Sequence, residues 1–200
     1  QNDSEIPIAV APWSSPEQME KLSGIDAVVH LAGKSIADGR WNESIKQEIR
    51  DSRIDLTTQL SEGLSKLENK PKVFVCASAI GIYGDRGSEM LDESAEPGDG
   101  FLADVGIQWE KACDAARQAG IRVANARLGI VLDPSGGALK KSLLPAKFCG
   151  GKLGSGSQWW SWVAIDDVIG AIYHSICSGD VSGAFYVPAP NPVTTADFAR

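Results

Sequence analysis

Three polar or ionisable side chains close short apolar runs of the sequence, and they are His30, Ser78 and Arg127. A hydroxyl such as that of Ser78, held at the end of a strand, could hydrogen-bond a substrate oxygen. Tyr83 follows in the same stretch and carries a phenol, but its nearest downstream lysine is Lys111, so no lysine on the next helical turn favours its ionisation. The alternative is that Tyr83 only packs. If the three runs are neighbouring strands, their polar ends meet at one edge of a sheet.

The runs that would position these groups are short and almost wholly apolar, which is typical of parallel strands covered on both faces. Strands are predicted at residues 6–11, 26–32, 73–77, 121–127 and 184–187. The carboxyl ends of such strands should point toward a ligand, because open parallel sheets bind ligands outside that edge.

Helical patterns alternate with these strands. Proline at a first helical position and a capping box start a short helix at Ser15-Pro16, and regular apolar spacing predicts one long helix from Asn42 to about Leu67. Further helices are expected at residues 102–118, from a cap at Asp166-Asp167 to about Cys177, and from Thr194 or Thr195. This alternation predicts a doubly wound α/β fold with a parallel sheet, in one domain over residues 1–200.

The composition excludes several classes of function. A formal net charge of -7 argues against nucleic-acid binding, which needs clustered Lys and Arg. The four widely spaced cysteines and two histidines disfavour a metal site and favour reduced thiols in the core. Because no apolar run approaches the roughly 20 residues of a membrane span and no signal pattern opens the chain, a cytoplasmic location is expected. A homodimer is left open.

Three loop regions could contact a ligand or only cover the core. The acidic stretch at residues 85–100 is interpreted as a solvated loop near the site rather than a metal site. Lys140 and Lys141 could face an anion, and the tryptophans at residues 159–162 could form a stacking wall, although a solvated lysine pair and packing beneath loops are the alternatives. Substrate contacts are expected from residues 133–162 and 184–200.

Three strand ends carry a resemblance to a known family: Val29-His30-Leu31-Ala32-Gly33, Ser78-Ala79-Ile80-Gly81-Ile82-Tyr83-Gly84 and Trp162-Val163-Ala164-Ile165-Asp166-Asp167-Val168. In this order they resemble the extended short-chain dehydrogenase/reductases, the NAD-dependent epimerase/dehydratase group. Further pieces, such as Ser52-Arg53 and Gly154-Ser155-Gly156, resemble the atypical subgroup named "epimerase family protein", some of whose members carry a cell-division-inhibitor label. The resemblance covers essentially the whole chain and implies a Rossmann-like sheet that binds NADP or NAD.

The same resemblance implies a set of cofactor-binding residues: His30, Leu31, Ala32, Gly33, Arg53, Ala77, Arg127, Leu128 and Gly129. The turn that ends at Gly33 would lie beside the adenosine and ribose, where small residues let the backbone approach the ligand. Arg127 and the two residues after it would lie near the nicotinamide. A turn without a ligand, an exposed helical arginine at Arg53 and a structural arginine at Arg127 are the alternatives.

Ser78 and Tyr83 are the catalytic candidates, but the family pattern is broken around them. Gly81 makes the Ser78 motif one residue longer than the common Ser-x-x-x-Tyr-Gly form, so Ser78 could be a turn residue only. Hydride chemistry in this superfamily uses a Tyr and a Lys four residues later, and a register anchored on Glu110 puts Leu102 and Gly106 at those two positions. Losing that pair should slow the ordinary reaction by about 10²- to 10⁴-fold, unless another group supplies the proton.

The glycine-rich loop that binds pyrophosphate at a helix N-terminus is also missing from the sequence. The strand at residues 6–11 would then have no partner, so we expect an upstream segment of about 40 residues or more that carries this loop. The five or so helical residues after Thr195 likewise suggest a cut C-terminus, since so short a helix is unstable alone. The alternative is that this chain binds dinucleotide poorly.

Two functions follow from these observations. One is an NAD(P)-dependent epimerase or oxidoreductase with altered catalytic residues, in which Ser78 orients a small or nucleotide-linked substrate and Tyr83 or water moves the proton. The other is a dinucleotide-binding regulator, for example of cell division, that kept the pocket and lost the chemistry. The retained strand-end motifs favour the first, and the missing Tyr and Lys favour the second. NADP is preferred over NAD by the resemblance alone.

Overall fold

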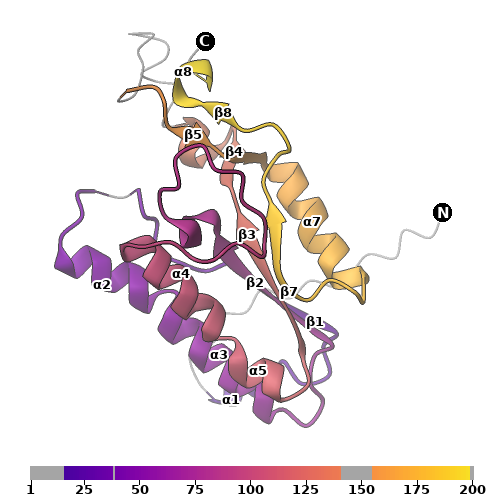
Figure 1. Ribbon diagram of the computed structural model, residues 1–200. Coiled ribbons are helices and arrows are strands. Elements are labelled where there is room, and N and C mark those ends of the chain that lie inside the picture. Colours follow the sequence, from indigo (N-terminus) through magenta and orange to yellow (C-terminus); the bar gives the residue numbers. More distant parts are fainter. Residues whose placement is uncertain (1–15, 38, 141–154, 199–200) are drawn as a thin grey trace.

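A four-stranded parallel sheet with the order β1-β2-β3-β7 forms the centre of the protein (Figure 1). The computed structural model describes residues 16–37, 39–140 and 155–198. In chain order the elements are α1 (Pro16–Glu20), β1 (Ala27–His30), α2 (Glu43–Asp51), α3 (Ile54–Lys66), β2 (Val73–Ala79), the 3₁₀ helix η1 (Ile80–Tyr83), α4 (Phe101–Lys111), α5 (Asp114–Gln118), β3 (Arg122–Leu128), β4 (Ile130–Asp133), β5 (Trp159–Trp160), β6 (Trp162–Ala164), α7 (Ile165–Cys177), β7 (Gly183–Val187), β8 (Val193–Thr194) and α8 (Thr195–Phe198). The predicted α/β class with a parallel sheet is confirmed.

The two faces of the sheet are covered by different helices, because successive residues of a strand point to opposite sides. Phe74 of β2 packs in a cluster with Leu64 of α3 and Trp109 of α4. The next residue, Val75, packs on the other face against Ile172 of α7. Figure 1 shows the sheet between α2–α5 and α7. This two-sided burial explains why the strand reads as a continuous apolar run.

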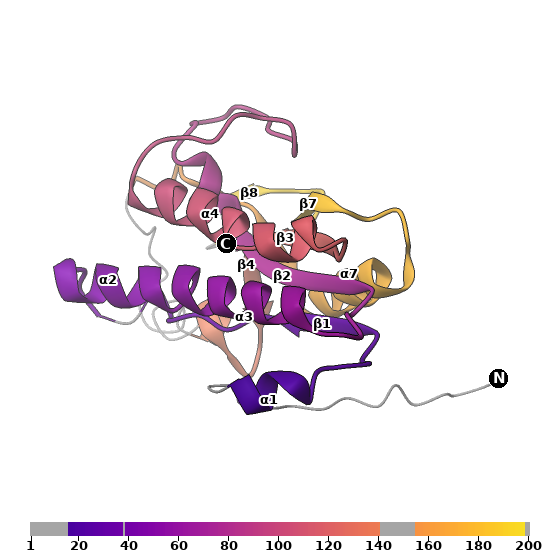
Figure 2. The same ribbon diagram turned by 90° about the horizontal axis from the view of Figure 1, so that it is seen from below.

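The predicted long helix over residues 42–67 is two helices, α2 and α3, which lie nearly in line (Figure 2). The break falls at Ser52 and Arg53. There the Ser52 hydroxyl donates to the carbonyl of Ile49 at 3.1 Å, and the backbone N–H of Arg53 donates to Arg50 rather than one residue earlier. This local side-chain bond and the tightened turn compete with the regular helical ladder. The apolar spacing alone could not reveal the break.

The predicted helix at residues 102–118 is likewise divided, into α4 and α5. Cys113 lies at the junction, where its backbone N–H donates to Glu110, three residues back, at 3.3 Å. The cap predicted at Asp166-Asp167 is wrong, since the N-cap of α7 is Ala164 and makes no side-chain bond. Both aspartates lie in the first turn instead, where carboxylates favour the positive end of the helix dipole.

Four short strands lie beside the main sheet, and of these only β6 falls at a strand end expected from the sequence. β4 pairs in parallel with β6, and β5 pairs antiparallel with β8. These pairings fold the tryptophan-rich stretch back toward the end of β3. The predicted strand at residues 6–11, the Ser15 part of the first cap and Lys141 lie outside the described residues. Of the cysteines, Cys76 and Cys113 are buried free thiols as expected, whereas Cys177 is exposed.

Candidate functional site

The carboxyl ends of β1, β2 and β3 lie side by side, as the sequence predicted. Ser78 is paired in register with Arg127, and His30 is paired with Cys76, two residues before Ser78. Register partners point to the same face of a sheet, and so do residues two apart along a strand. His30, Ser78 and Arg127 therefore all face the layer of α3 and α4.

Arg127 is the centre of a buried polar network that closes the ends of β2 and β3. Its guanidinium binds Glu110 of α4 through two bonds, Nε to Oε1 at 2.8 Å and Nη2 to Oε2 at 2.9 Å. The Ser78 hydroxyl donates to the same carboxylate at 2.6 Å. This bidentate geometry is the strong form of an arginine–carboxylate pair, and the carboxylate raises the pKa of Arg127 above its ordinary value. We call this group and Tyr83 the Arg127 network.

Tyr83 joins the network to the acidic loop at residues 84–100. Its hydroxyl donates to the carbonyl of Asp92 at 3.0 Å and is a hydrogen-bond partner of Arg127, which also donates to the carbonyl of Glu93 at 3.1 Å. The carboxylate of Glu93 accepts the backbone N–H of Tyr186 at 2.8 Å. Burial and the Tyr83 hydroxyl raise the pKa of Tyr186, whose ring packs edge-on against that of Tyr83. The loop is thus fastened to η1, β3 and β7.

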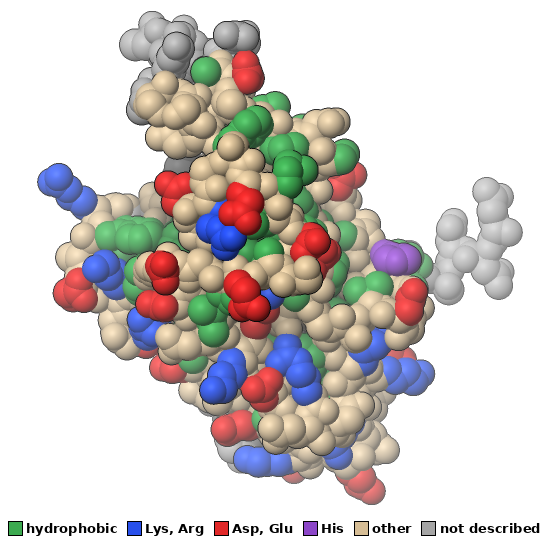
Figure 3. Space-filling view, in the orientation of Figure 1, with side chains coloured by type: hydrophobic (Ala, Val, Ile, Leu, Met, Phe, Trp, Pro, Cys, Tyr) green, Lys and Arg blue, Asp and Glu red, His purple; other side chains and the backbone are tan. Residues whose placement is uncertain are grey.

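The loop at residues 84–100 is rich in aspartate and glutamate. Figure 3 shows Asp and Glu side chains gathered over the part of the molecule where Figure 1 draws this loop. Its acidic residues are exposed, while its backbone carbonyls at Asp92 and Glu93 accept hydrogen bonds from Tyr83 and Arg127. The predicted solvated loop is therefore present, but two of its residues, Asp92 and Glu93, are anchored.

The two catalytic candidates are enclosed by these contacts. Ser78 is 2% exposed and Tyr83 is 3% exposed, and each hydroxyl already has its hydrogen-bond partners within the protein. In this arrangement neither hydroxyl is free to contact a substrate. Glu110 and Glu93 were not singled out from the sequence as site residues. One indication in the sequence that Glu110 belongs to the site is that it is an acidic residue on a predicted helix that could face the strand-end residue Arg127.

The end of β1 is built differently, because its last residues stay open. His30 is buried, but Leu31, Ala32 and Gly33 directly after it are exposed. His30 Nε2 lies 3.1 Å from the hydroxyl of Thr57, and burial lowers the pKa of His30. The histidine therefore holds the strand end against α3, while the following turn faces solvent.

Arg53 lies against this open turn. An added Cβ on Gly33 would come within 3.2 Å of the guanidinium carbon of Arg53. The Ser52 hydroxyl also accepts the backbone N–H of Lys34 at 2.9 Å, which ties the turn to the junction of α2 and α3. Trp109 supports the guanidinium from below, with the guanidinium carbon 5.1 Å from its ring centre. The break in the helix thus delivers Arg53 to the turn.

The remaining predicted cofactor residues, Ala77, Leu128 and Gly129, lie at the same edge of the sheet but are less exposed to solvent. Ala77 is 5% exposed and faces away from the Arg127 network, with Ala126 as its register partner. Gly129 faces protein, because a Cβ there would lie 2.3 Å from the carbonyl oxygen of Ser161. Leu128 is half-buried. The small size of Gly129 is explained by this close backbone approach, without a ligand.

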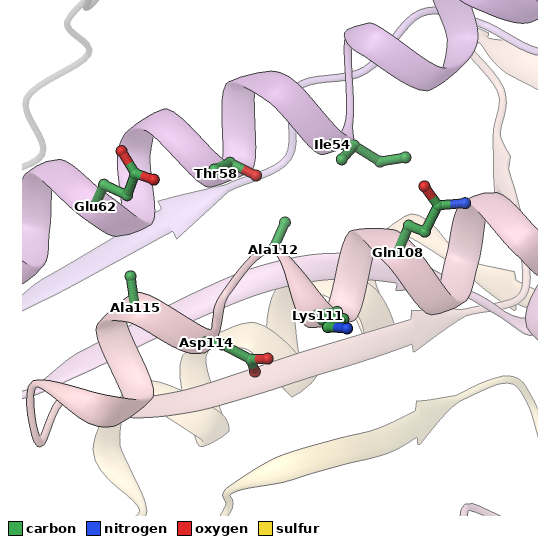
Figure 4. A pocket seen from close by; sticks show the side chains of 8 residues that line it. All are labelled: Ile54, Thr58, Glu62, Gln108, Lys111, Ala112, Asp114 and Ala115. Atoms are coloured by element: carbon green, nitrogen blue, oxygen red, sulfur yellow. The ribbon is translucent and has the colours of Figure 1, made fainter.

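A groove of about 460 Å³ lies elsewhere, between α3 and the α4–α5 pair (Figure 4). Its lining side chains all come from these helices and their junction: Ile54, Thr58, Glu62, Gln108, Lys111, Ala112, Asp114 and Ala115. No strand residue contributes to it. The groove is therefore separate from the carboxyl edge of the sheet.

Within the described residues, no helix has the length and apolar character needed to cross a membrane. The same part of the chain contains no group of three or more His, Cys, Asp or Glu side chains placed to hold a metal ion.

Comparison with known proteins shows to which family the chain belongs. A family model described as the NAD dependent epimerase/dehydratase family matches residues 10–187. The chain belongs to this family. A Mycobacterium bovis member called epimerase family protein Mb2239 is 39% identical over 188 residues, which are 94% of this chain and 62% of that protein. The chain thus spans less than two thirds of the length of this relative.

Two solved structures of epimerase relatives share the fold at substantial identity. One is described as a nucleoside-diphosphate sugar epimerase from Corynebacterium glutamicum, with 43% identity, a TM-score of 0.79 and coverage of 90% of this chain and 38% of that chain. The other is human epimerase family protein SDR39U1 with NADPH, with 31% identity, a TM-score of 0.82 and coverage of 92% of this chain and 64% of that chain. The Rossmann-like fold predicted from the resemblance is confirmed.

In this epimerase-family chain, Leu102 and Gly106 stand at the positions that the sequence register assigns to the catalytic Tyr and Lys, and the surroundings of Gly106 disfavour a larger side chain. A Cβ on Gly106 would already lie 3.0 Å from the Cβ of Ile82. The space next to Gly106 is occupied by η1, so a side chain at this position would require Ile82 to shift. Leu102 is half-buried and lies near Gly81.

Proposed function

We propose that this protein binds NADP(H) across the carboxyl edge of β1, β2 and β3 as an NAD(P)-dependent epimerase or oxidoreductase-like protein with altered catalytic residues. The observation that carries the proposal is the end of β1, where Leu31, Ala32 and Gly33 are exposed and Gly33 lies beside the guanidinium of Arg53. The small residues Ala32 and Gly33 and this cation suit the close approach of a ribose and phosphates. The likeness to the human relative with NADPH supports the choice of cofactor.

The dinucleotide would supply hydride chemistry through its nicotinamide ring, and the protein would supply orientation. In this proposal Arg127 and Glu110 shape the protein wall at the ends of β2 and β3. Ser78 and Tyr83 are positioning residues in the observed arrangement, since their hydroxyls hold Glu110 and the loop carbonyl of Asp92. Either one would act as a catalytic residue only after the loop at residues 84–100 leaves the Arg127 network.

The substrate side is proposed to lie over residues 133–162 and 184–200. Trp160 stacks on Phe198 with ring centres 4.5 Å apart, and Trp162 donates its indole N–H to the carbonyl of Asn191 at 3.1 Å. Trp159 is 49% exposed and remains available for contact. We propose a nucleoside-diphosphate sugar as substrate class, by likeness to the relative from Corynebacterium glutamicum.

A dinucleotide-binding regulator is the second candidate function. It is favoured by Gly106, whose close packing on Ile82 disfavours a larger side chain such as the usual lysine, and by the enclosed hydroxyl of Tyr83. A regulator of this kind would bind the cofactor and turn over no substrate. The buried thiols of Cys76 and Cys113 suit either role in a reducing compartment, and we propose the cytoplasm.

The test is a titration of the full chain with NADPH and NADH, followed by nicotinamide fluorescence, and then a turnover screen with nucleoside-diphosphate sugars. Saturable NADPH binding with sugar-dependent turnover supports the enzyme. Saturable binding without turnover supports the regulator. Absence of binding to both dinucleotides would overturn the proposed function.

A further inference from the structure

Cys76 and Cys113 form a thiol pair in the core that the proposed function does not use. Cys76 belongs to β2, and Cys113 stands at the junction of α4 and α5, which packs on the same face of the sheet. Asn125 is the register partner of Cys76, so their side chains share that face, and Asn125 Nδ2 donates to the sulfur of Cys113 at 3.6 Å. Both thiols are free and 0% exposed. The strand register and this hydrogen bond therefore bring the two sulfurs together.

The surroundings of the two sulfurs differ. Asn125 is held in one orientation because its Oδ1 accepts a hydrogen bond from Arg117, and its Nδ2 therefore faces Cys113. Contact with Cys76, the Asn125 amide and the charge of Arg117 lower the pKa of Cys113, against the effect of burial. Contact with Cys113 and burial raise the pKa of Cys76. Because the thiolate is the reactive form of cysteine, Cys113 is the nucleophile of the pair and Cys76 is the second thiol.

The junction of α4 and α5 gives small reagents an approach to Cys113. Ala112 and Asp114, the residues on either side of it, line the groove of about 460 Å³ between α3 and the α4–α5 pair (Figure 4). The backbone N–H of Cys113 donates to Glu110, three residues back, at 3.3 Å, so the regular helical ladder is interrupted there. Local opening at such a break costs less free energy than global unfolding and would admit a molecule as small as a peroxide.

We propose that Cys76 and Cys113 are an oxidation site, at which a hydroperoxide converts the two thiols into an intramolecular disulfide. The thiolate of Cys113 attacks one oxygen of the peroxide and the O–O bond breaks. A sulfenic acid forms, while the other oxygen takes the proton that Cys113 gave up and leaves as water or an alcohol. The sulfur of Cys76 then attacks that of Cys113, so the S–S bond forms, the S–O bond breaks and the hydroxyl leaves as water with the proton of Cys76. The thiols lose two hydrogens and two electrons, which the peroxide takes up.

The disulfide would join β2 to the α4–α5 junction. It closes a ring from residue 76 to residue 113, which contains the whole acidic loop and α4. Such a cross-link restricts the unfolded chain, so the oxidised protein should resist urea better than the reduced protein. Two buried thiols that only fill space are the competing explanation, and they would react as separate groups or remain reduced. The inference is independent of the proposed function, because it requires neither a cofactor nor a substrate.

The test treats the reduced full chain with hydrogen peroxide, alkylates the remaining thiols in urea and maps the tryptic peptides without reductant. Trypsin separates the cysteines, because Cys76 falls in the peptide 73–86 and Cys113 in 112–117, whereas Cys149 and Cys177 fall in 148–152 and 153–200. We expect 73–86 to be linked to 112–117, with a mass about 2 Da below the sum of the two peptides, and dithiothreitol to release them. The midpoint of urea unfolding should rise on oxidation and return on reduction.

Cys177→Ser is the matched control, because Cys177 is an exposed thiol on α7 and its loss should leave the linked peptides unchanged. Cys76→Ser should abolish the link and let Cys113 oxidise further to a sulfinic acid, whereas Cys113→Ser should leave Cys76 reduced. The proposal is overturned if peroxide leaves both buried thiols of wild type open to alkylation, or if it oxidises the two peptides without joining them. The wild-type peptide map needs no substitution, so it remains decisive if a serine variant does not fold.

Discussion

Replacing Arg127 by methionine should destabilise the protein far more than the loss of a surface arginine. The side chain of Arg127 is 9% exposed and that of its partner Glu110 is 15% exposed. Methionine fills most of the volume of the arginine stem but leaves the carboxylate of Glu110 without its counter-charge. The hydrogen bond from the Ser78 hydroxyl to this carboxylate would then remain. Removal of one member of a buried ion pair typically costs about 3–5 kcal/mol, because the other charge stays buried and uncompensated.

A second contribution comes from the acidic loop. Arg127 also donates to the carbonyl of Glu93 and contacts the Tyr83 hydroxyl, so its loss weakens the attachment of the loop at residues 84–100, which keeps its bonds to Tyr83 and Tyr186. Because the loop is exposed, its release should add little to the free energy of unfolding. It should instead increase proteolysis within the loop, since local opening no longer requires breaking these bonds.

The assay is urea unfolding of the full chain at neutral pH, monitored by tryptophan fluorescence. Arg86→Met is the matched control. Arg86 makes an equally bidentate pair with Glu89, at 2.8 Å for both bonds, but the two side chains are 34% and 51% exposed. The exposed pair should contribute no more than about 1 kcal/mol. Equal destabilisation by the two substitutions would refute the argument that burial of the Arg127 pair determines the cost.

Two further predictions test other parts of the structure. Burial lowers the pKa of His30 below its ordinary value of 6.5, so at lower pH the unfolded chain binds a proton that the folded chain does not. The stability should therefore fall as the pH decreases from about 6.5, by up to about 1.4 kcal/mol per pH unit, and His30→Gln should flatten that part of the profile in urea unfolding between pH 7.5 and 5.5. A profile that His30→Gln leaves unchanged would contradict this assignment. Gly98→Ala should strongly lower the free energy of unfolding and displace the acidic loop, because its Cβ would lie 2.0 Å from the carbonyl oxygen of Tyr83. Gly170→Ala is the control, since an added Cβ there has nothing within 4 Å. It should stabilise the protein by about 0.5–1 kcal/mol through the higher helix propensity of alanine in α7. Thermal melts of the two alanine variants check the difference, and similar melting temperatures would count against the close contact at Gly98.

Much of the fold could be predicted from the pattern of apolar residues. The runs around Val75 and Ala124 read as buried strands because both of their faces are covered, and the structure has them in the core. The breaks at Ser52 and Cys113 could not be read from that pattern, since the apolar spacing continues across each break. They depend on local bonds to Ile49 and Glu110 that leave no trace in hydropathy.

The candidate site was predicted less completely. The positions of His30, Ser78 and Arg127 at one edge followed from strand order, but the directions of their hydrogen bonds did not. Glu110 could be seen in the sequence as an acidic residue on a helix, yet only the packing of α4 on the sheet brings its carboxylate to Ser78 and Arg127. The anchoring of Glu93 to Tyr186 joins residues far apart in sequence and could not be anticipated from spacing.

Hydrogen–deuterium exchange of the full chain with and without NADPH shows whether the dinucleotide binds across the carboxyl ends of β1, β2 and β3. A dinucleotide across the carboxyl edge of the sheet should slow exchange at residues 30–34, 79–82 and 128–131 together. Slowed exchange confined to the helical groove, at residues 54–62 and 108–115, with no change at the three strand ends, would contradict the account.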